Sequence, residues 1–166
     1  MGTTFVTMEN DPDGSPKGFW MRDSMLELWL RLLALHLPEP RDEGTFDATR
    51  AIRSQWLLAS RGYFSGCVPH ALPEAGSSAA GREVMRIAIG NLLEELGRSR
   101  SPIEPAFISL LGCDRGWRTP VERQSLEDVG RAFLDLLDGR ISSTAESTER
   151  MPGTKPYPAP RTPPHE

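Results

Sequence analysis

The chain has 166 residues, which is the size of one ordinary domain, and 38% of them are hydrophobic. Its formal net charge is −4 and its pI is about 5.5. A nucleic-acid-binding protein needs a basic face, so this charge balance argues against nucleic acid as a partner. The same balance permits a basic protein partner.

The cysteine content indicates a reducing compartment. Cys67 and Cys113 are the only cysteines, too few for a disulfide framework. The first ten residues lack a basic stretch followed by an apolar run, so no secretory signal is expected. Lys17 and Lys155 are the only lysines among 19 basic residues, an arginine excess typical of GC-rich bacterial genomes. We therefore expect reduced thiols and a cytoplasmic protein.

The N-terminal segment, residues 1–18, is polar and is expected to be irregular. Its Asp11-Pro12-Asp13-Gly14 run predicts a turn. Residues 3–8 are the only short stretch that could pair as a strand, and no further strand is expected.

The segment 19–37 predicts a central helix that ends at Pro38. It is apolar around most of its circumference, which is typical of a helix buried on several sides. Asp23, Glu27 and Arg31 lie four residues apart and form its narrow polar stripe. These charges make a membrane span costly, so no membrane partner is expected.

Two further helices are predicted over residues 47–61 and 79–97. In the first, Ile52 and Trp56 share a face, and Gly62 is placed to end the helix. The second has an apolar face of regular helical spacing and ends at Gly97. Residues 62–78 between them are rich in glycine, proline and serine, which predicts a loop.

The last two helices are predicted to begin at two similar motifs, Ser101-Pro102-Ile103-Glu104 and Thr119-Pro120-Val121-Glu122. Each motif combines a capping hydroxyl, a proline and a glutamate in the order of a capping box. The first helix could instead begin at Pro105 with Glu104 as its cap, and it should end near Gly112. The second should end at Gly139.

From residue 140 onward the chain is rich in Ser, Thr, Pro and charge, and it is expected to be disordered. A proline-rich run, 156–164, favours a polyproline II conformation that could dock in an aromatic groove. The expected organisation is therefore an irregular segment (1–18), an all-α compact bundle of about five helices (19–139) and a disordered tail (140–166).

The Tyr63–His70 loop contains the most unusual set of side chains. Tyr63, Phe64, Cys67 and His70 lie between glycines and a proline, on a loop where functional residues often occur. Cys67 and His70 could form a thiol–imidazole pair, which would make the protein a small enzyme or a redox sensor. The same residues could instead form a recognition loop or close one end of the bundle.

Two other kinds of site are weaker. Asp23 and Glu27, with Arg31, could line a ligand pocket, although a plain ion-pair network explains the same spacing. Cys67, His70, Cys113 and His36 lack the paired short spacings of a zinc site, so no metal is predicted. No motif for a phosphate or another cofactor is present, so no cofactor is expected.

Trp117 lies in a polar connection next to arginines, including Arg115, as an interface anchor would, although it could equally fold back as a staple before Thr119. Catalytic motifs are missing, so we favour a protein-binding protein that acts stoichiometrically over an enzyme. An immunity protein that neutralises a toxin is one concrete form of such a protein. The predicted binding residues are Tyr63, Phe64, His70, Arg115 and Trp117.

Overall fold

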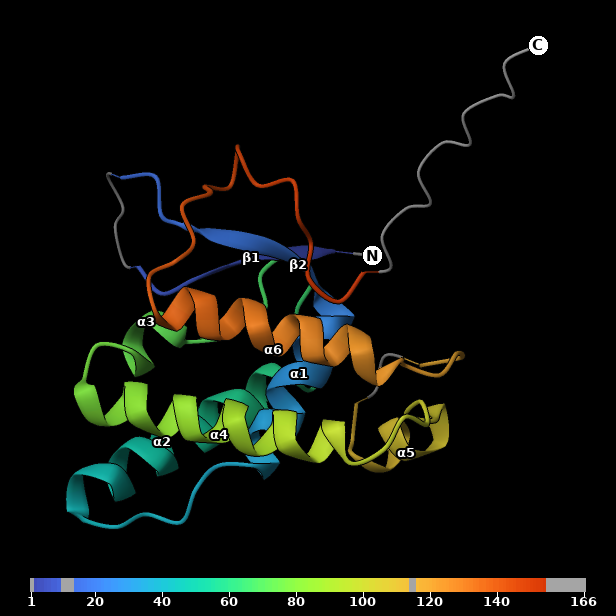
Figure 1. Ribbon diagram of the computed structural model, residues 1–166, viewed down its shortest axis with the longest axis horizontal. Coiled ribbons are helices and arrows are strands. Elements are labelled where there is room, and N and C mark those ends of the chain that lie inside the picture. The colour runs from blue at the N-terminus through green and yellow to red at the C-terminus, as the bar shows by residue number, and fades with distance from the viewer. Residues whose placement is uncertain (1, 10–13, 114–115, 155–166) are drawn as a thin grey trace.

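The computed structural model describes residues 2–9, 14–113 and 116–154. Within these ranges the two strands form one antiparallel sheet, in which Phe5 lies opposite Trp20. The fold is therefore mixed α/β, and the prediction of an all-α bundle is wrong. In chain order the elements are β1 (Thr3–Thr7), β2 (Gly18–Arg22), α1 (Asp23–Leu35), α2 (Glu43–Ala59), α3 (Leu72–Ala75), α4 (Ala79–Gly97), α5 (Pro105–Leu110) and α6 (Arg123–Leu137) (Figure 1).

The hairpin explains why the predicted helix 19–37 begins too early. Phe19 and Met21 are buried, whereas Trp20 is half-buried and Arg22 is exposed, which is the two-residue alternation of a strand. Trp20 is itself apolar, so this alternation is hidden in the residue types. Its ring contacts Phe5 edge-on across the sheet, with the ring centroids 5.3 Å apart.

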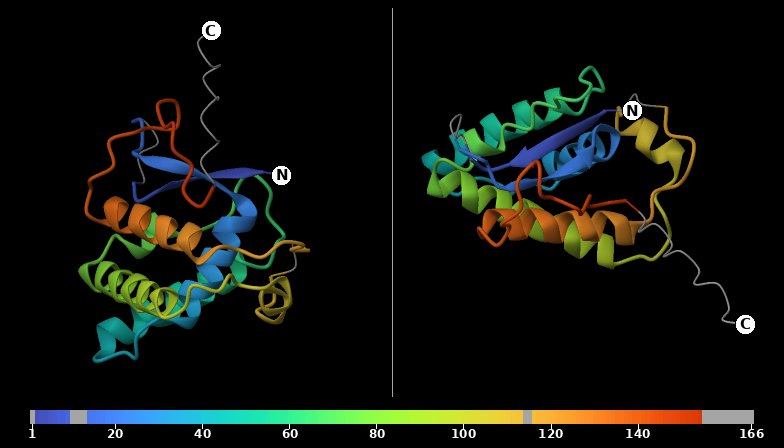
Figure 2. Two further views of the ribbon diagram at one scale, coloured as in Figure 1. Left: turned by 45° about the vertical axis from the view of Figure 1, so that its right-hand side comes forward. Right: turned by 90° about the horizontal axis from the view of Figure 1, so that it is seen from above.

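α1 is the central helix of the fold, as predicted. Seen from above, it lies between α2 and the pair formed by α4 and α6, and the hairpin covers its N-terminal end (Figure 2). Leu26, Leu28, Trp29, Leu30 and Leu33 of this helix are completely buried. No helix in the described ranges combines the length and the apolar content that crossing a bilayer requires.

α2 and α4 follow from local sequence signals. α2 begins earlier than predicted because Asp42 and Thr45 form a capping box, in which the Thr45 N–H donates to the Asp42 carboxylate at 2.8 Å. α4 has the predicted bounds, and the Ser78 hydroxyl accepts the Gly81 N–H at 3.0 Å.

Gly130 lets α6 pack closely against α4 and α1. A Cβ atom at this position would lie 2.6 Å from Leu93 Cδ2 and 3.0 Å from the Trp29 ring. Phe133, one turn further along α6, contacts the Trp29 ring with centroids 5.5 Å apart. Because Gly130 has no side chain, α6 can lie directly over Trp29 of α1.

The two similar motifs pair with each other instead of forming capping boxes. Ile103 and Val121 each donate their N–H to the other's carbonyl, at 2.8 and 2.9 Å. The helices begin only after this bridge: α5 begins at Pro105 with Glu104 as its cap, which confirms the alternative start, and α6 follows Glu122; neither glutamate makes a side-chain cap bond. The bridge joins the segment before α5 to the segment before α6.

The segment after α6 differs from the expected disordered tail as far as residue 154. The Gly18 N–H donates to the Ser143 carbonyl at 2.8 Å, and Trp20 Nε1 donates to the Ala145 carbonyl at 2.9 Å. Asp128 forms an ion pair with Arg150 and accepts the Gly153 N–H at 3.2 Å. These bonds order the segment without apolar periodicity. Residues 155–166, and most of the predicted turn at 11–14, lie outside the described residues.

Replacing Gly153 with alanine should destabilise the fold more than the same change at Gly139. Both glycines have a positive φ, +78° and +66°, which an alanine adopts at a cost of roughly 1–2 kcal/mol. Only at Gly153 would the new Cβ meet neighbours, Val129 Cγ2 at 2.8 Å and Met25 Cγ at 2.9 Å. Overpacking at Gly153 should therefore lower the free energy of unfolding by about 1–3 kcal/mol more, which urea denaturation measures. Equal losses would show that this segment does not pack on the body of the protein.

Candidate functional site

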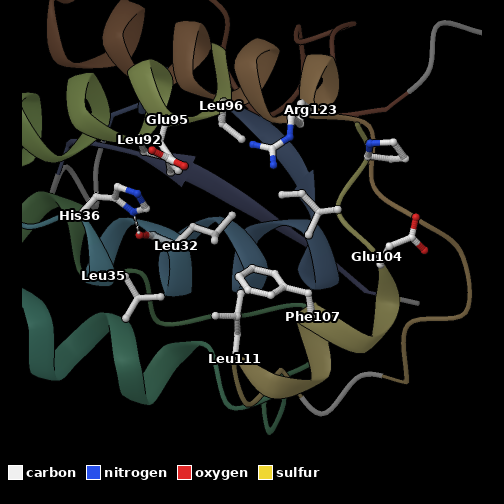
Figure 3. Close-up of a pocket in the computed structure, with 12 residues that line it drawn as sticks. Leu32, Leu35, His36, Leu92, Glu95, Leu96, Glu104, Phe107, Leu111 and Arg123 are labelled. Atoms are coloured by element: carbon white, nitrogen blue, oxygen red, sulfur yellow. Dashed lines mark hydrogen bonds between the residues drawn. The ribbon is translucent and has the colours of Figure 1, made fainter. Parts of the chain in front are cut away.

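An apolar groove lies between the C-terminal ends of α1 and α4 and the short helix α5, beside the start of α6 (Figure 3). Its cavity volume is about 460 Å³, which lies within the range typical of binding sites in proteins. Its buried side chains are Leu32, Leu92, Leu96 and Ile103.

The rim of the groove exposes large apolar side chains. Leu35 is 58% exposed and Phe107 is 51% exposed, while Leu110, which follows Phe107 on the same face of α5, is 84% exposed. Ile108, on the other face of α5, is completely buried. Large apolar side chains gathered around a cavity are typical of an interaction site.

Arg123 is the charged side chain directed into this groove (Figure 3). Its Nε donates to the Ser101 carbonyl at 2.7 Å, which fixes the plane of the guanidinium group. Among the acidic lining residues, Glu95 binds Arg98 at 2.9 Å, and the Glu104 carboxylate is directed away from the cavity. The Nη groups of Arg123 are therefore well placed to donate to a bound group.

His36 forms part of the opposite wall. Its Nδ1 donates to the Leu32 carbonyl at 2.7 Å. The His36 carbonyl accepts from Asn91 Nδ2 at 3.1 Å. The bond from Asn91 holds the end of α1 against α4.

The Tyr63–His70 loop is attached to the hairpin and to the start of α1. The Gly66 N–H donates to the Asp23 carboxylate at 2.7 Å, and the Val68 N–H donates to the Thr4 hydroxyl at 2.9 Å. Phe64 packs against the core, whereas Tyr63 is 72% exposed. The loop thus presents one exposed aromatic side chain from a fixed backbone.

His70 is buried, and both of its ring nitrogens are bound to the backbone. Nδ1 accepts the Leu72 N–H at 3.2 Å, so Nε2 carries the hydrogen and donates to the Phe5 carbonyl at 3.2 Å. Burial lowers the pKa of His70 below its usual value, and the bond to Phe5 and the charge of Glu74 oppose this only in part. The neutral imidazole is therefore a structural link between β1 and α3.

The free energy of unfolding should decrease when the pH falls below about 6.5, the ordinary pKa of histidine. The unfolded chain takes up a proton there, whereas the folded chain resists protonation of His70 until its lowered pKa is reached. Protonation of His70 alone should change the free energy of unfolding by no more than about 1.4 kcal/mol per pH unit. Urea unfolding at pH 7.5 and 5.5 measures it, and His70→Gln should reduce the difference. An unchanged difference in the variant would contradict this assignment.

His70 is not placed to act as a base for the Cys67 thiol. Cys67 is exposed and Cys113 is buried, and neither is in a disulfide. Both nitrogens of His70 are occupied by backbone groups, so neither can accept a proton from the thiol in this arrangement. Among the described residues, no group of three His, Cys, Asp or Glu side chains is placed to hold a metal ion.

The polar stripe of α1 is mostly inside the protein. Asp23 and Glu27 are both 1% exposed, and Asp23 accepts from the Thr4 hydroxyl at 2.8 Å as well as from the loop. Arg31 Nη2 donates to the Gly112 carbonyl at 3.4 Å. None of the three lines the groove or a second cavity of about 200 Å³ beside Trp56.

Trp117 lies in the connection between α5 and α6, apart in sequence from the Tyr63–His70 loop. Its side chain is half-buried and packs against the core. In the described part of the chain, no hydrogen bond or ring contact joins it to that loop, and its Nε1 has no hydrogen-bond partner. Arg115 lies outside the described residues.

Sequence reasoning missed Leu35, Phe107 and Leu110 as site residues. A signal for the last two was present in the short helix, where Phe107 and Leu110 are three residues apart on one face and Ile108 occupies another. A short helix that is apolar on two faces needs a packing partner for each face, and the core of the protein covers only one of them.

No protein-family model, no curated protein and no solved structure matches this chain. The functional inference therefore depends on the geometry and chemistry of the site.

Proposed function

We propose that this protein binds a partner protein stoichiometrically through the groove between α1, α4 and α5. The observation that carries the proposal is the exposure of Leu35 and Phe107 at the edge of an apolar cavity, together with the exposure of Leu110 on the same helix as Phe107. A small molecule inside the cavity would leave Leu110 in water, whereas a protein surface would cover the cavity and its rim together.

An immunity protein that neutralises a toxin in the cytoplasm is the concrete form of this proposal. The net charge of −4 would speed encounter with a basic partner and make the association rate sensitive to salt. The Tyr63–His70 loop is a second candidate contact surface, supported by the exposure of Tyr63 and by the anchoring of its backbone. His70 supports this loop from inside the protein.

The alternative functions have less support. A small enzyme or redox sensor would need Cys67 and His70 to exchange a proton, but both imidazole nitrogens are bound to backbone groups. A ligand pocket lined by Asp23, Glu27 and Arg31 would need a cavity beside them, and neither of the two cavities described above reaches these residues.

Phe107→Ala should weaken binding of the physiological partner, whereas Phe46→Ala should not. The two phenylalanines are equally exposed, at 51%, but Phe46 lies on α2 away from the groove. Loss of an aromatic anchor typically costs at least about 1–2 kcal/mol, or roughly ten-fold in Kd. The partner is obtained by co-purification from the source cell, and its affinity for each variant is measured by calorimetry.

Tyr63→Ala in the same experiment tests whether the loop is part of the surface. Equal affinities for Phe107→Ala, Tyr63→Ala and the unchanged protein would contradict the proposed function. A turnover activity that disappears in Cys67→Ser would replace it with the enzymatic alternative.

A further inference from the structure

We propose that the partner segment seated in the groove is a single amphipathic α-helix with a carboxylate that pairs with Arg123. This inference rests on the proposed function and adds the conformation and the chemistry of the bound segment. Three observations support it: the backbone around the groove, the size of the cavity and the placement of Arg123.

The groove offers little backbone hydrogen bonding to an extended peptide. Its walls are mainly helices, and at the C-terminal ends of α1 and α4 the N–H groups are bonded within each helix, so a bound segment would meet last-turn carbonyls but few N–H donors. Pro102 has no N–H, and the N–H and carbonyl of Ile103 are both bonded to Val121. An extended segment needs backbone partners, as in strand addition, whereas a helix brings its own backbone bonds already made.

The apolar cavity has room for more than one anchor side chain. An apolar cavity of about 150 Å³ holds one benzene molecule, so about 460 Å³ accommodates roughly three side chains of that size. A helix presents three such side chains on one face at positions i, i+3 or i+4, and i+7. Its remaining apolar surface would cover Phe107 at the edge of the cavity and Leu110, which is exposed on the same helix.

Arg123 determines the charge of the bound segment. The Ser101 carbonyl occupies Nε, so the Nη groups directed into the groove remain as donors. A carboxylate forms short, charge-assisted hydrogen bonds with such a guanidinium group. The carboxylate of Glu95 is paired with Arg98, which also pairs with Glu94, and Arg123 is the arginine that lines the groove.

A phage-displayed library of helix-forming peptides, randomised on one face and panned against the full-length protein, tests this inference. We expect enriched peptides to carry apolar residues at helical spacing and one Asp or Glu. Replacing that acid with its amide should weaken binding roughly ten-fold, and a proline in the middle of the peptide should abolish binding. Arg123→Gln should remove the preference for the acid, whereas Arg118→Gln, an exposed control, should leave it unchanged.

The peptide amide control needs no change in the protein, so it remains decisive if Arg123→Gln fails to fold. Enrichment of no peptide, of peptides insensitive to Phe107→Ala, or of peptides without an acid would overturn the inference. The proposed function fails separately, when Phe107→Ala leaves the affinity for the physiological partner unchanged. If that affinity falls but the selected peptides lack helical spacing, the groove is an interface and only the helical occupant is wrong.

Discussion

Replacing Leu30 with alanine should lower the free energy of unfolding by about 2–5 kcal/mol. Leu30 is completely buried in the middle of α1, the helix against which both α2 and α4 pack. The change removes apolar area from the core and leaves a cavity, because helices packed on both sides cannot close over it fully. Leu33, which is equally buried on the same helix, should give a loss of the same order.

Leu35→Ala is the matched control, because it makes the same chemical change on the same helix. Leu35 is 58% exposed, so its loss should change the free energy of unfolding by no more than about 0.5 kcal/mol. Urea denaturation of the three variants measures the difference. Losses below about 1 kcal/mol for both buried leucines would mean that α1 is not the core element described here.

The elements predictable from the sequence are those whose signals are local. The bounds of α4 follow from its apolar spacing and the Ser78 cap, and the burial of α1 follows from its nearly continuous apolar surface. β2 was not predictable in this way, because Phe19-Trp20-Met21 is equally apolar in a helix and in a strand. Pairing with residues 3–7 decides between them, and that is a contact between separate parts of the chain.

The same distinction explains the errors in the second half of the chain. The motif at Ser101 and the motif at Thr119 each have the local pattern of a helix start, yet Ile103 and Val121 bond to each other across the α5 region. Ser143 and Ala145 lack any apolar pattern, yet their carbonyls are bonded to β2 and to Trp20. Isolated backbone hydrogen bonds of this kind, outside a regular sheet, leave no periodic pattern in the residue types.

The candidate site was hidden for a different reason. Tyr63, His70 and Trp117 are noticeable by residue type and by their loop positions, but His70 is inside the protein and Trp117 is half-buried. Phe107 and Leu110 look like ordinary core residues, and only their exposure in the folded chain sets them apart. Exposure depends on which helix faces remain uncovered after packing, which residue spacing alone does not determine.

Asp23→Ala should lower the free energy of unfolding by about 1–3 kcal/mol, although it removes no apolar side chain. The Asp23 carboxylate is 1% exposed and accepts from the Thr4 hydroxyl at 2.8 Å and from the Gly66 N–H at 2.7 Å. Thr4 in turn accepts the Val68 N–H at 2.9 Å. Removing the carboxylate leaves the buried Thr4 hydroxyl without its acceptor, which costs about 1–3 kcal/mol, and it releases the Gly66 N–H, which lies at an exposed residue.

A double-mutant cycle with Thr4→Val tests whether these bonds act as one unit. If they do, the sum of the stability losses of the two single variants should exceed the loss of the double variant by about 0.5–3 kcal/mol, because Thr4 and Asp23 share one hydrogen bond. Asp47→Ala, at an exposed position of α2, is the control and should change stability by less than about 0.5 kcal/mol.

Limited proteolysis gives the Asp23→Ala experiment a second readout, which concerns the loop itself. Asp23 and Thr4 hold the backbone of the Tyr63–His70 loop at Gly66 and Val68, so Asp23→Ala should increase cleavage between residues 60 and 70 more than cleavage elsewhere. Leu30→Ala destabilises the whole fold, so it should not increase cleavage between residues 60 and 70 more than cleavage elsewhere. If both variants increase cleavage uniformly, Asp23 contributes to global stability alone and does not hold this loop against β1.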